Sequence, residues 1–385
     1  MHTYIIAYTE KIMKRKHENA VTQELEENLC RISFQCTWEE KLEYMFNVLL
    51  IDNVFKDSKM SLITGGADGI VRIHSSCSDN ESDLKFVKTF LKYETKSTSI
   101  MSMVVHETTM LNAKDILVGD GKGMLTIFMN RQILNRRLFA NQQISAIFVD
   151  TDAAGNMCIN IGSRDGVLAA VTPYEILWKC RLTECLKKDD QTMDDVIEVT
   201  ALHTLRVHSS SIDCNYLLVA DTAKCLHVFQ NGSHVMTIQV PSVVTSMCTG
   251  HFIGVKNDNS NNDSNRTPTK TSRFIAEEQI ALATKTGSVL VLSNFSVTPY
   301  ANLPYPITQI RTFPFSNSDS LDGIFCSGHF NHLAILKNKE LIGRLPTEDW
   351  VHTFDILPGD EVSHSFYVVL GCLDKRVKVV RVEAV

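Results

Sequence analysis

Oxygen-bearing side chains gather in one short stretch, where Asp150, Asp152 and Asn156 alternate with small residues around a glycine. Alternating oxygen ligands around a glycine-bearing turn are how protein loops wrap calcium. Ala154 and Cys158 stand where further ligands would be needed, because calcium takes about six to eight oxygens. We therefore predict no bound metal here and a turn stabilised by its own hydrogen bonds. Asp150, Asp152 and Asn156 stay the candidate ligands if a cation does bind.

The other chemistry-bearing patterns favour structure over catalysis. His329 and His332 have the spacing of a metal-binding pair, but the sequence offers no third ligand near them. The glycine-rich run from Gly119 to Gly123 reads as a hairpin turn, with no helix N-terminus behind it to bind phosphate. The chain has no GxSxG, HExxH or GxxxxGK[ST] motif, and no GxGxxG ahead of a helix. We predict neither an enzyme nor a cofactor site.

Two tryptophans are the candidate partner-binding residues. Trp178 lies in a predicted outer strand, and Trp350 lies in a link between two predicted repeats. Large aromatic side chains at an exposed face or edge often anchor protein partners. The structural alternative is that both side chains only pack between neighbouring repeats.

The composition is that of a globular protein with a sizeable core. Of the 385 residues, 44% are hydrophobic and 21% are charged, and the net charge is -6. This average charge predicts no nucleic-acid partner and no binding to anionic membranes. A local basic face carrying Arg131, Arg136 and Arg137 is the one place where nucleic acid could still bind.

The cysteines indicate the cytosol or the nucleus, and we predict a cytoplasmic location. All eleven are spread singly without a CxxC pair, which favours reduced thiols over a disulfide framework or a zinc site. The start of the chain lacks the basic segment and apolar run of a signal peptide. No apolar run approaches the ~18 residues of a membrane span, so we predict no transmembrane segment.

The elements that must position these residues are repeated β-hairpins. The residues from Ser61 to Ser75 have the pattern of a strand, a tight glycine-rich turn and a second strand. The same pattern recurs at Ile116 to Phe128, Ile159 to Val171 and Ile280 to Leu292. The predicted turn centres are Gly69, Gly123, Gly166, Lys224, Gly287, Asn331 and Lys375. These turn centres are 43 to 63 residues apart. Propeller blades typically repeat at about 40 to 50 residues, with insertions in their loops.

We predict an all-β fold, a seven-bladed β-propeller with four strands in each blade, with six and eight blades as alternatives. The last unit, Val351 to Val382, has only three predicted strands, whereas Arg31 to Trp38 is a lone strand ahead of the first unit. A ring closes most stably when a strand from one terminus completes the blade begun by the other. We therefore expect Arg31 to Trp38 to complete the last blade.

The predicted domain boundaries follow from this arrangement. Residues 1–29 form an N-terminal tail, helical or disordered, and residues 30–385 form the propeller. The segment 256–273 is low in hydrophobic residues and rich in Asn, Ser and Asp. Such a segment cannot bury enough apolar surface to offset its ordering entropy, so we predict a disordered insertion in the fifth blade.

One part of the chain carries a family resemblance. An apolar strand that ends in Asp-x-Asp is predicted at Phe148 to Asp152, and a Gly-Asn pair follows at Gly155 and Asn156. A second strand that ends in glycine is predicted at Ile159 to Gly162, and an Asp-Gly hairpin at Arg164 to Leu168. In this order the chain resembles WD-type β-propellers, and more particularly the degenerate intracellular relatives of the FG-GAP propeller of integrin α-subunits. The calcium ligands of that family are incomplete here, and no blade carries the Gly-His and Trp-Asp dipeptides of a standard WD repeat.

The spacing around Thr284 to Gly287 and Leu333 to Val351 is also similar to the FG-GAP-repeat protein of the KICSTOR complex, and equally to the propellers of BBSome subunits. The resemblance implies a non-catalytic protein–protein interaction scaffold, a subunit of a cytoplasmic multiprotein complex, in KICSTOR-like nutrient signalling at the lysosome. The alternative is a BBSome-like subunit of ciliary trafficking. In both readings, partners recruit the chain to its organelle and the partners are other protein subunits.

A rival hypothesis from another class is a propeller that binds a small ligand or an enzyme substrate in its central channel. It requires convergent ionisable side chains on the innermost strands. The predicted innermost strands, Ile144 to Val149 and Ile307 to Phe313 among them, are chiefly apolar, so we expect no small-molecule ligand. A cluster of ionisable groups at the channel mouth would favour the rival.

Overall fold

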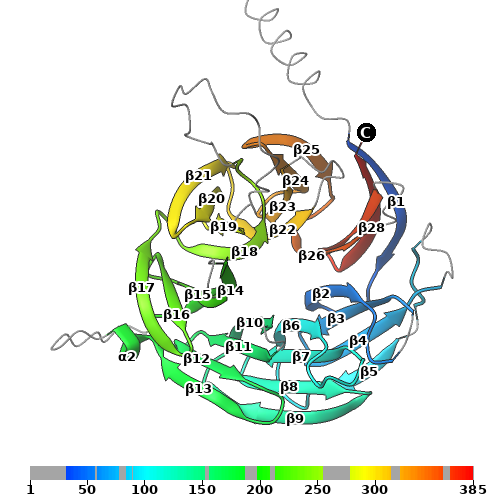
Figure 1. Cartoon of the computed structure of the whole chain (residues 1–385). Coiled ribbons are helices and arrows are strands. Elements are labelled where there is room, and N and C mark those ends of the chain that lie inside the picture. The colour runs from blue at the N-terminus through cyan, green and yellow to red at the C-terminus, as the bar shows by residue number, and fades with distance from the viewer. Residues whose placement is uncertain are drawn as a thin grey trace, which may run out of the picture.

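The computed structural model describes residues 32–56, 59–77, 84–88, 90–151, 156–186, 197–208, 213–254, 278–313, 321–358 and 365–384. Within these ranges, seven separate sheets of four antiparallel strands stand around a central channel (Figure 1). The predicted all-β, seven-bladed propeller is confirmed. The predicted tail 1–29 and the predicted insertion 256–273 lie outside the described residues.

Blades 1 to 4 follow each other in chain order, each from an inner strand to an outer one. Blade 1 contains β2 (Phe46–Asp52), β3 (Ser61–Gly66), β4 (Ile70–Ser75) and β5 (Leu91–Glu94). Blade 2 contains β6 (Ile100–His106), β7 (Asp115–Asp120), β8 (Met124–Met129) and β9 (Gln132–Leu138). Blade 3 contains β10 (Ile144–Thr151), β11 (Met157–Ser163), β12 (Val167–Val171) and β13 (Ile176–Arg181). Blade 4 contains β14 (Val199–His208), β15 (Asp213–Asp221), β16 (Cys225–Gln230) and β17 (Ser233–Gln239).

The remaining blades complete the circle. Blade 5 contains β18 (Val244–Gly250), β19 (Gln279–Thr284), β20 (Ser288–Ser293) and β21 (Ser296–Asn302). Blade 6 contains β22 (Ile307–Phe313), β23 (Gly323–Gly328), β24 (His332–Lys337) and β25 (Glu340–Pro346). Blade 7 contains β26 (Val351–Pro358), β27 (Ser365–Cys372), β28 (Arg376–Ala384) and β1 (Ile32–Lys41). The short helix α2 (Leu182–Leu186) leads from blade 3 towards blade 4.

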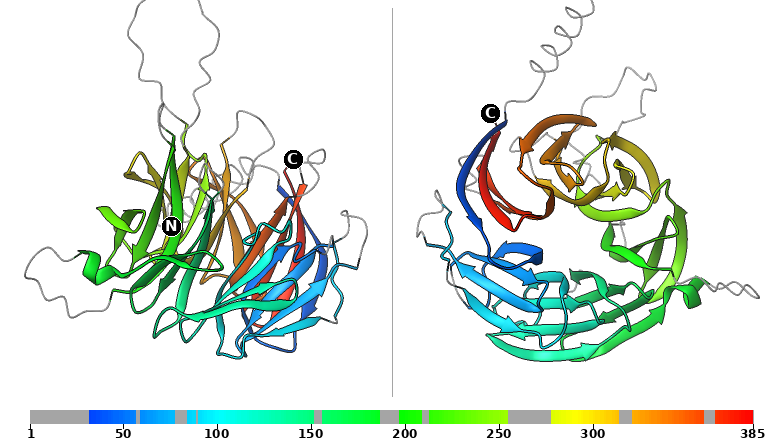
Figure 2. Two further views of the ribbon diagram at one scale, coloured as in Figure 1. Left: turned by 60° about the horizontal axis from the view of Figure 1, so that its bottom comes forward. Right: turned by 180° about the vertical axis from the view of Figure 1, so that it is seen from behind.

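The first strand of the chain closes the ring. β1 pairs antiparallel with β28, with Phe34 opposite Val382 and Lys41 opposite Arg376. Figure 1 and the view from behind in Figure 2 both show β1, in blue, beside β28, in red. The predicted closure is confirmed, and the closing strand extends beyond the predicted end at Trp38.

The hydrophobic core lies between the blades. The two middle strands of a blade are covered on both faces, so they appear in the sequence as short, nearly continuous apolar runs. Between blades 5 and 6, for example, Ala281 and Val291 of one blade pack with Ile310 and Ile324 of the next. The channel is therefore surrounded by a ring of small cores, and each blade depends on its neighbours.

The tight turns match the predicted turn centres. Six of the seven have a left-handed φ: Gly69 (77°), Gly123 (82°), Gly166 (74°), Lys224 (63°), Gly287 (93°) and Lys375 (72°). Glycine adopts this region without steric cost, whereas a residue with a side chain does so only under strain. The two lysines therefore occupy positions where glycine would be easier to accommodate.

Two outer strands differ from the predicted ranges. We expected the last strand of blade 1 at Phe86 to Lys92, but β5 begins only at Leu91. Phe86 is buried instead against the ring of Trp38 in β1, with 5.6 Å between ring centroids, and so serves the closure of the ring. In blade 2 we expected Arg136 to Ala140, whereas β9 already begins at Gln132, directly after a tight turn.

Candidate functional site

The beginning of each inner strand is used to hold the blades together. In all seven inner strands the second residue forms a β-bulge, which turns its side chain out of the regular pairing. The Thr200 hydroxyl donates to the carbonyl of Val244 in the next blade at 2.6 Å, and Thr245 donates to Ile307 at 2.7 Å. Polar groups at this end of the channel are thus engaged in structure.

A hydrogen bond from one of the first three residues of an inner strand crosses every boundary between blades. At the closure, Nε2–H of His352 in blade 7 donates to the carbonyl of Phe46 in blade 1 at 3.0 Å. The other donor and acceptor pairs are Asn47 and Ile100, Ser102 and Ile144, Ser145 and Val199, and Gln309 and Phe354. The innermost strands therefore form a continuous hydrogen-bonded ring.

Ionisable side chains gather at the other end of the inner strands, which the chiefly apolar sequence of those strands did not lead us to expect. Asp150 of blade 3 lies 3.6 Å from the guanidinium of Arg206 in blade 4, and Arg311 of blade 6 lies 3.7 Å from Asp355 in blade 7. The Lys114 ammonium of blade 2 is 2.6 Å from the carboxylate of Asp52 in blade 1.

These carboxylates face neighbouring blades. Asp355 also accepts the backbone N–H of Ile51 across the closure at 3.0 Å, and Asp150 accepts the side-chain amide of Asn215 at 2.9 Å. Burial raises the pKa of Asp355 in spite of the nearby Arg311. The ionisable groups that would favour a channel function are present, but their contacts are those of bridges between blades.

One cavity of about 300 Å³ opens into the channel between the inner strands of blades 3 to 6. The same position of these four strands is occupied by Phe148, His203, Cys248 and Arg311. Burial lowers the pKa of His203 to about 4, and its Nδ1–H donates to the carbonyl of Thr204 at 2.9 Å. Burial raises the pKa of Cys248 to about 12.

The chemistry of this cavity is limited by those protonation states. At neutral pH it contains a neutral imidazole and a protonated thiol, so it has no thiolate nucleophile. The guanidinium of Arg311 is 39% exposed and could attract a small anion. The arrangement can bind, but it does not pair a nucleophile with a base.

Two of the three candidate calcium ligands, Asp150 and Asn156, lie among the described residues. Asp150 is bound to Arg206 and Asn215 as described, Asn156 is exposed at the far end of the same loop, and Asp152 lies outside the described residues. An ion-paired Asp150 would have to exchange a cationic partner for a metal. The prediction that this turn is structural is not tested further.

Another group with metal-binding side chains is Asp221, Cys225 and His227, whose candidate ligand atoms lie within 4.8 Å of one another. Asp221 accepts the backbone N–H of Cys225 at 2.8 Å and Nε2–H of His227 at 2.9 Å, while Nδ1 of His227 lies 2.9 Å from the Thr237 hydroxyl. Both carboxylate oxygens and both ring nitrogens have partners. The network caps the turn between β15 and β16.

The two predicted partner-binding tryptophans lie in different environments. Trp178 is half-buried, parallel to the Phe229 ring at 6.5 Å, and so close to Gly232 that a Cβ there would lie 2.8 Å from the indole. It links blades 3 and 4. Trp350 is 39% exposed and stacks on His329 with 4.8 Å between ring centroids. Their role in binding stays a prediction.

The sequence reasoning missed a set of large hydrophobic side chains exposed on the outside of blades 2 to 4. We call this set the apolar rim: Ile133, Leu138, Tyr174, Ile176, Leu177, Val235 and Met236. Tyr174 lies in the turn before β13, and the other six lie in β9, β13 and β17, which follow one another along the outer circumference (Figure 1). The only sequence signal was that apolar residues recur in outer strands where polar ones would be expected.

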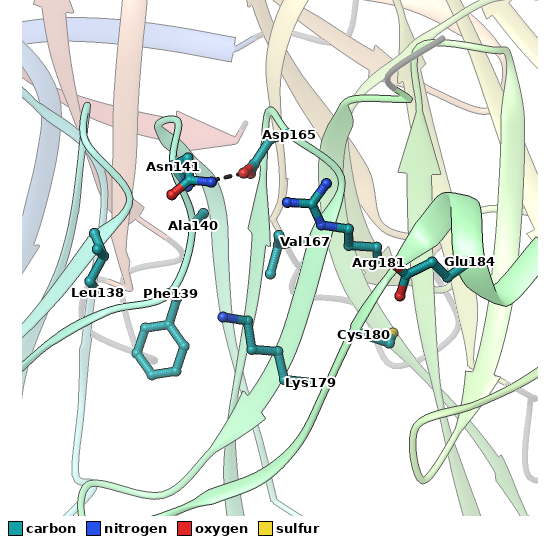
Figure 3. A pocket seen from close by; sticks show the side chains of 10 residues that line it. All are labelled: Leu138, Phe139, Ala140, Asn141, Asp165, Val167, Lys179, Cys180, Arg181 and Glu184. Carbon is teal, nitrogen blue, oxygen red and sulfur yellow. Dashed lines mark hydrogen bonds between the residues drawn. The ribbon is translucent and has the colours of Figure 1, made fainter. Parts of the chain in front are cut away.

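A groove of about 360 Å³ indents the rim between the end of β9 and the start of α2 (Figure 3). Leu138 and Val167 supply its apolar wall, and Lys179 and Arg181 extend into it from β13. Asp165 accepts the backbone N–H of Asn141 at 3.0 Å. The rim thus combines exposed apolar groups with a polar groove.

No protein-family model matches the chain, and no curated protein matches it in sequence. Solved structures do match in three dimensions. The crystal structure of BBS1N in complex with ARL6DN, soaked with mercury, has a TM-score of 0.63 at 10% identity, over 91% of this chain and 97% of that one. The WD40 β-propeller domain of Doa1 has a TM-score of 0.59 at 12% identity, also over 91% and 97%.

The likeness is one of fold. It confirms the predicted resemblance to WD-type and BBSome propellers at that level, while the resemblance to the FG-GAP protein of KICSTOR stays a prediction. A shared propeller fold does not by itself imply a shared function. Among the described residues, no helix has the length and apolar character needed to cross a membrane.

Proposed function

We propose that this chain is a non-catalytic protein–protein interaction scaffold, in which residues 30–385 act as one domain of a cytoplasmic multiprotein complex. The observation that carries the proposal is the apolar rim. Single exposed hydrophobic residues are normal on protein surfaces, but a concentration of them on one part of the surface marks an interaction site. The free cysteines of the described chain, without any disulfide among them, suit a reducing compartment.

KICSTOR-like nutrient signalling at the lysosome and BBSome-like ciliary trafficking are the two candidate assemblies. Fold likeness to BBS1N, a propeller solved in complex with ARL6DN, supports the second, and the spacing similarity supports the first. In either assembly the partners are other protein subunits. Trp350, exposed between blades 6 and 7, is a second candidate anchor for them.

Ligand binding in the channel is the alternative function, and the exposed guanidinium of Arg311 in the cavity favours it. We rank it second because the carboxylates at the channel mouth bridge neighbouring blades. The cavity also lacks a thiolate nucleophile. The rim, by contrast, has apolar side chains for which no described residue provides cover.

Purification of the tagged chain from cells at near-native expression tests the scaffold function. We expect partner subunits in stoichiometric amounts, and a Leu177→Glu variant that loses them, because a charge in the middle of an apolar contact is costly. The matched control is Leu91→Glu, since Leu91 is 45% exposed on the outer strand of blade 1 and Leu177 is 49% exposed. Recovery of the wild-type chain as a lone monomer would refute the scaffold function.

A further inference from the structure

We propose that the outer edge of β13 binds an extended, acidic segment of a partner protein, which adds to blade 3 as a fifth strand. This inference rests on the proposed scaffold function and deepens it, because it assigns a surface and a chemical class of partner. An extended segment can pair with a free sheet edge through its main chain and gain specificity from its side chains.

The edge of β13 is open in the described chain. β13 is the last strand of its sheet, so one side of its backbone has no neighbouring strand. Unpaired N–H and C=O groups on an edge strand are a template for another strand. Natural edge strands often carry charged side chains that discourage pairing with another strand. The charged side chains of β13 are Lys179 and Arg181, and both are positive.

Basic residues are concentrated on β9 and β13. These two strands carry Arg136, Arg137, Lys179 and Arg181 and contain no Asp or Glu. The other outer strands show no such excess. β17 and β21 have no Asp, Glu, Lys or Arg, and β5 and β25 each have one basic and one acidic residue. β1 has two Glu and one Lys. In a chain of net charge -6, this local excess of positive charge is specific to blades 2 and 3.

Arg137, Lys179 and Arg181 have no ion pair within the described part of the chain. Arg136 donates to the carbonyl of Lys96 at 2.9 Å.

The groove also has two carboxylates. Asp165 is held by the Ser163 hydroxyl at 2.6 Å and by the N–H of Asn141 at 3.0 Å. Glu184 faces the groove from α2. Neither carboxylate neutralises Lys179 or Arg181 at ion-pair distance.

The alternation along β13 defines which side chains an added strand would meet. Lys179 and Arg181 are exposed, whereas Trp178 and Cys180 between them are half-buried. Directly opposite side chains on paired strands interact most strongly, and opposite charges stabilise such pairs. Acidic residues at every second position of the incoming segment would therefore face Lys179 and Arg181.

Apolar side chains beside these cations favour a peptide over a nucleic acid. Leu138 in the groove is 56% exposed, and Leu177 in the bulge at the start of β13 is 49% exposed. A polynucleotide backbone would leave both in contact with charged phosphate, whereas apolar residues of a peptide would cover them. A segment that alternates acidic and apolar residues fits both features.

Fluorescence anisotropy with a labelled synthetic peptide that alternates Glu and Val tests the proposal on the full chain. We expect binding that weakens about tenfold or more in the double variant Lys179→Glu/Arg181→Glu, and in Lys179→Ala/Arg181→Ala to a smaller degree. Arg344→Glu is the matched control, because Arg344 is an exposed arginine on the outer strand β25. A peptide of equal charge with N-methylated alternate residues should bind much more weakly, because it cannot pair as a strand.

Equal affinity for the wild-type chain and both double variants would overturn the proposal, as would equal affinity for the N-methylated peptide. So would tighter binding of a single-stranded oligonucleotide with a steep dependence on salt. The thermal unfolding midpoint of each variant should match the wild type, since the substituted side chains are exposed. If partner subunits co-purify equally with wild type and double variants, the scaffold function stands and only the β13 site is refuted.

Discussion

Histidines packed within the blades, among them His74, His203 and His352, illustrate at the residue scale how packing decides chemistry. Burial lowers the pKa of His203 to about 4, and it also lowers the pKa values of His74 and His352. His203 could act as a base by its type alone, but its lowered pKa makes it a weak one, and its Nδ1–H is bound to a backbone carbonyl. The same burial that disfavours catalysis makes these residues sensitive to acid.

We predict that the thermal unfolding midpoint falls as the pH is lowered from about 6.5 to about 4. Below a pKa of about 6.5 the unfolded chain protonates its histidines while the folded chain does not, so protonation favours unfolding. The lowered pKa values of Asp68, beside Arg72, and Glu348, beside Lys378, add to this loss of stability once the pH falls below about 5. The raised pKa of Asp355 acts in the opposite direction.

His203→Gln should flatten this pH dependence, and His329→Gln, at an exposed histidine, should leave it unchanged. Midpoints measured by calorimetry across the range provide the test. A wild-type midpoint that is constant from pH 6.5 to 4, or an unchanged slope in His203→Gln, would contradict the assigned burial.

At the scale of the elements, the tight turns between the second and third strands control how each blade folds. Gly123 has a φ of 82°, and a Cβ built on it would overlap the backbone carbonyl of Ala140. Lys224 occupies the corresponding turn in blade 4 at a φ of 63°. The turn at Gly123 thus requires glycine, whereas the turn at Lys224 accommodates a side chain at the cost of backbone strain.

We predict opposite effects of substitution at these two positions. Gly123→Ala should lower the free energy of unfolding by about 2 kcal/mol or more, because strain and overlap add. Lys224→Gly should change it by less than about 1 kcal/mol, in the stabilising direction, because relief of strain exceeds the added entropy of the unfolded chain. Denaturant titrations measure both, and a destabilised Lys224→Gly would show that the strain is absent.

Much of this architecture could be predicted because the middle strands and turns carry local signals. Short apolar runs on both sides of a tight turn identify the hairpins. The closure follows from one unpaired strand near the start of the chain and one missing strand in the last blade. The outer strands are less determined, since they are partly exposed. Phe86 was expected in the last strand of blade 1, but its ring packs against Trp38 of the closing strand β1.

The candidate sites were less predictable than the fold because they depend on contacts between blades. Arg311 and Asp355 are isolated polar residues in separate inner strands, and only the register of two blades brings them to 3.7 Å. Trp178 was recognised as a large aromatic of an outer strand, but its contact with Gly232 arises from the next blade. The apolar rim likewise exists only once the ring places β9, β13 and β17 in succession along the circumference.

At the scale of the whole molecule, closing the ring determines which surfaces remain available to partners. The inner strands are joined by hydrogen bonds and ion pairs, and the middle strands are buried between blades. The outer strands are the edges of their sheets, and in blades 2 to 4 they carry the apolar rim. The interaction scaffold that we propose is therefore expected to bind through its circumference.

Hydrogen–deuterium exchange of the full chain, alone and with its co-purified partner subunits, tests this conclusion most directly. We predict that partner binding slows exchange in β13 (Ile176–Arg181) and its neighbours β9 and β17, because their amides become paired or covered. Exchange in the channel strands β14 and β22 should be unchanged. Slowed exchange in β14 and β22 with none in β9, β13 or β17 would contradict binding through the rim and favour a function in the channel.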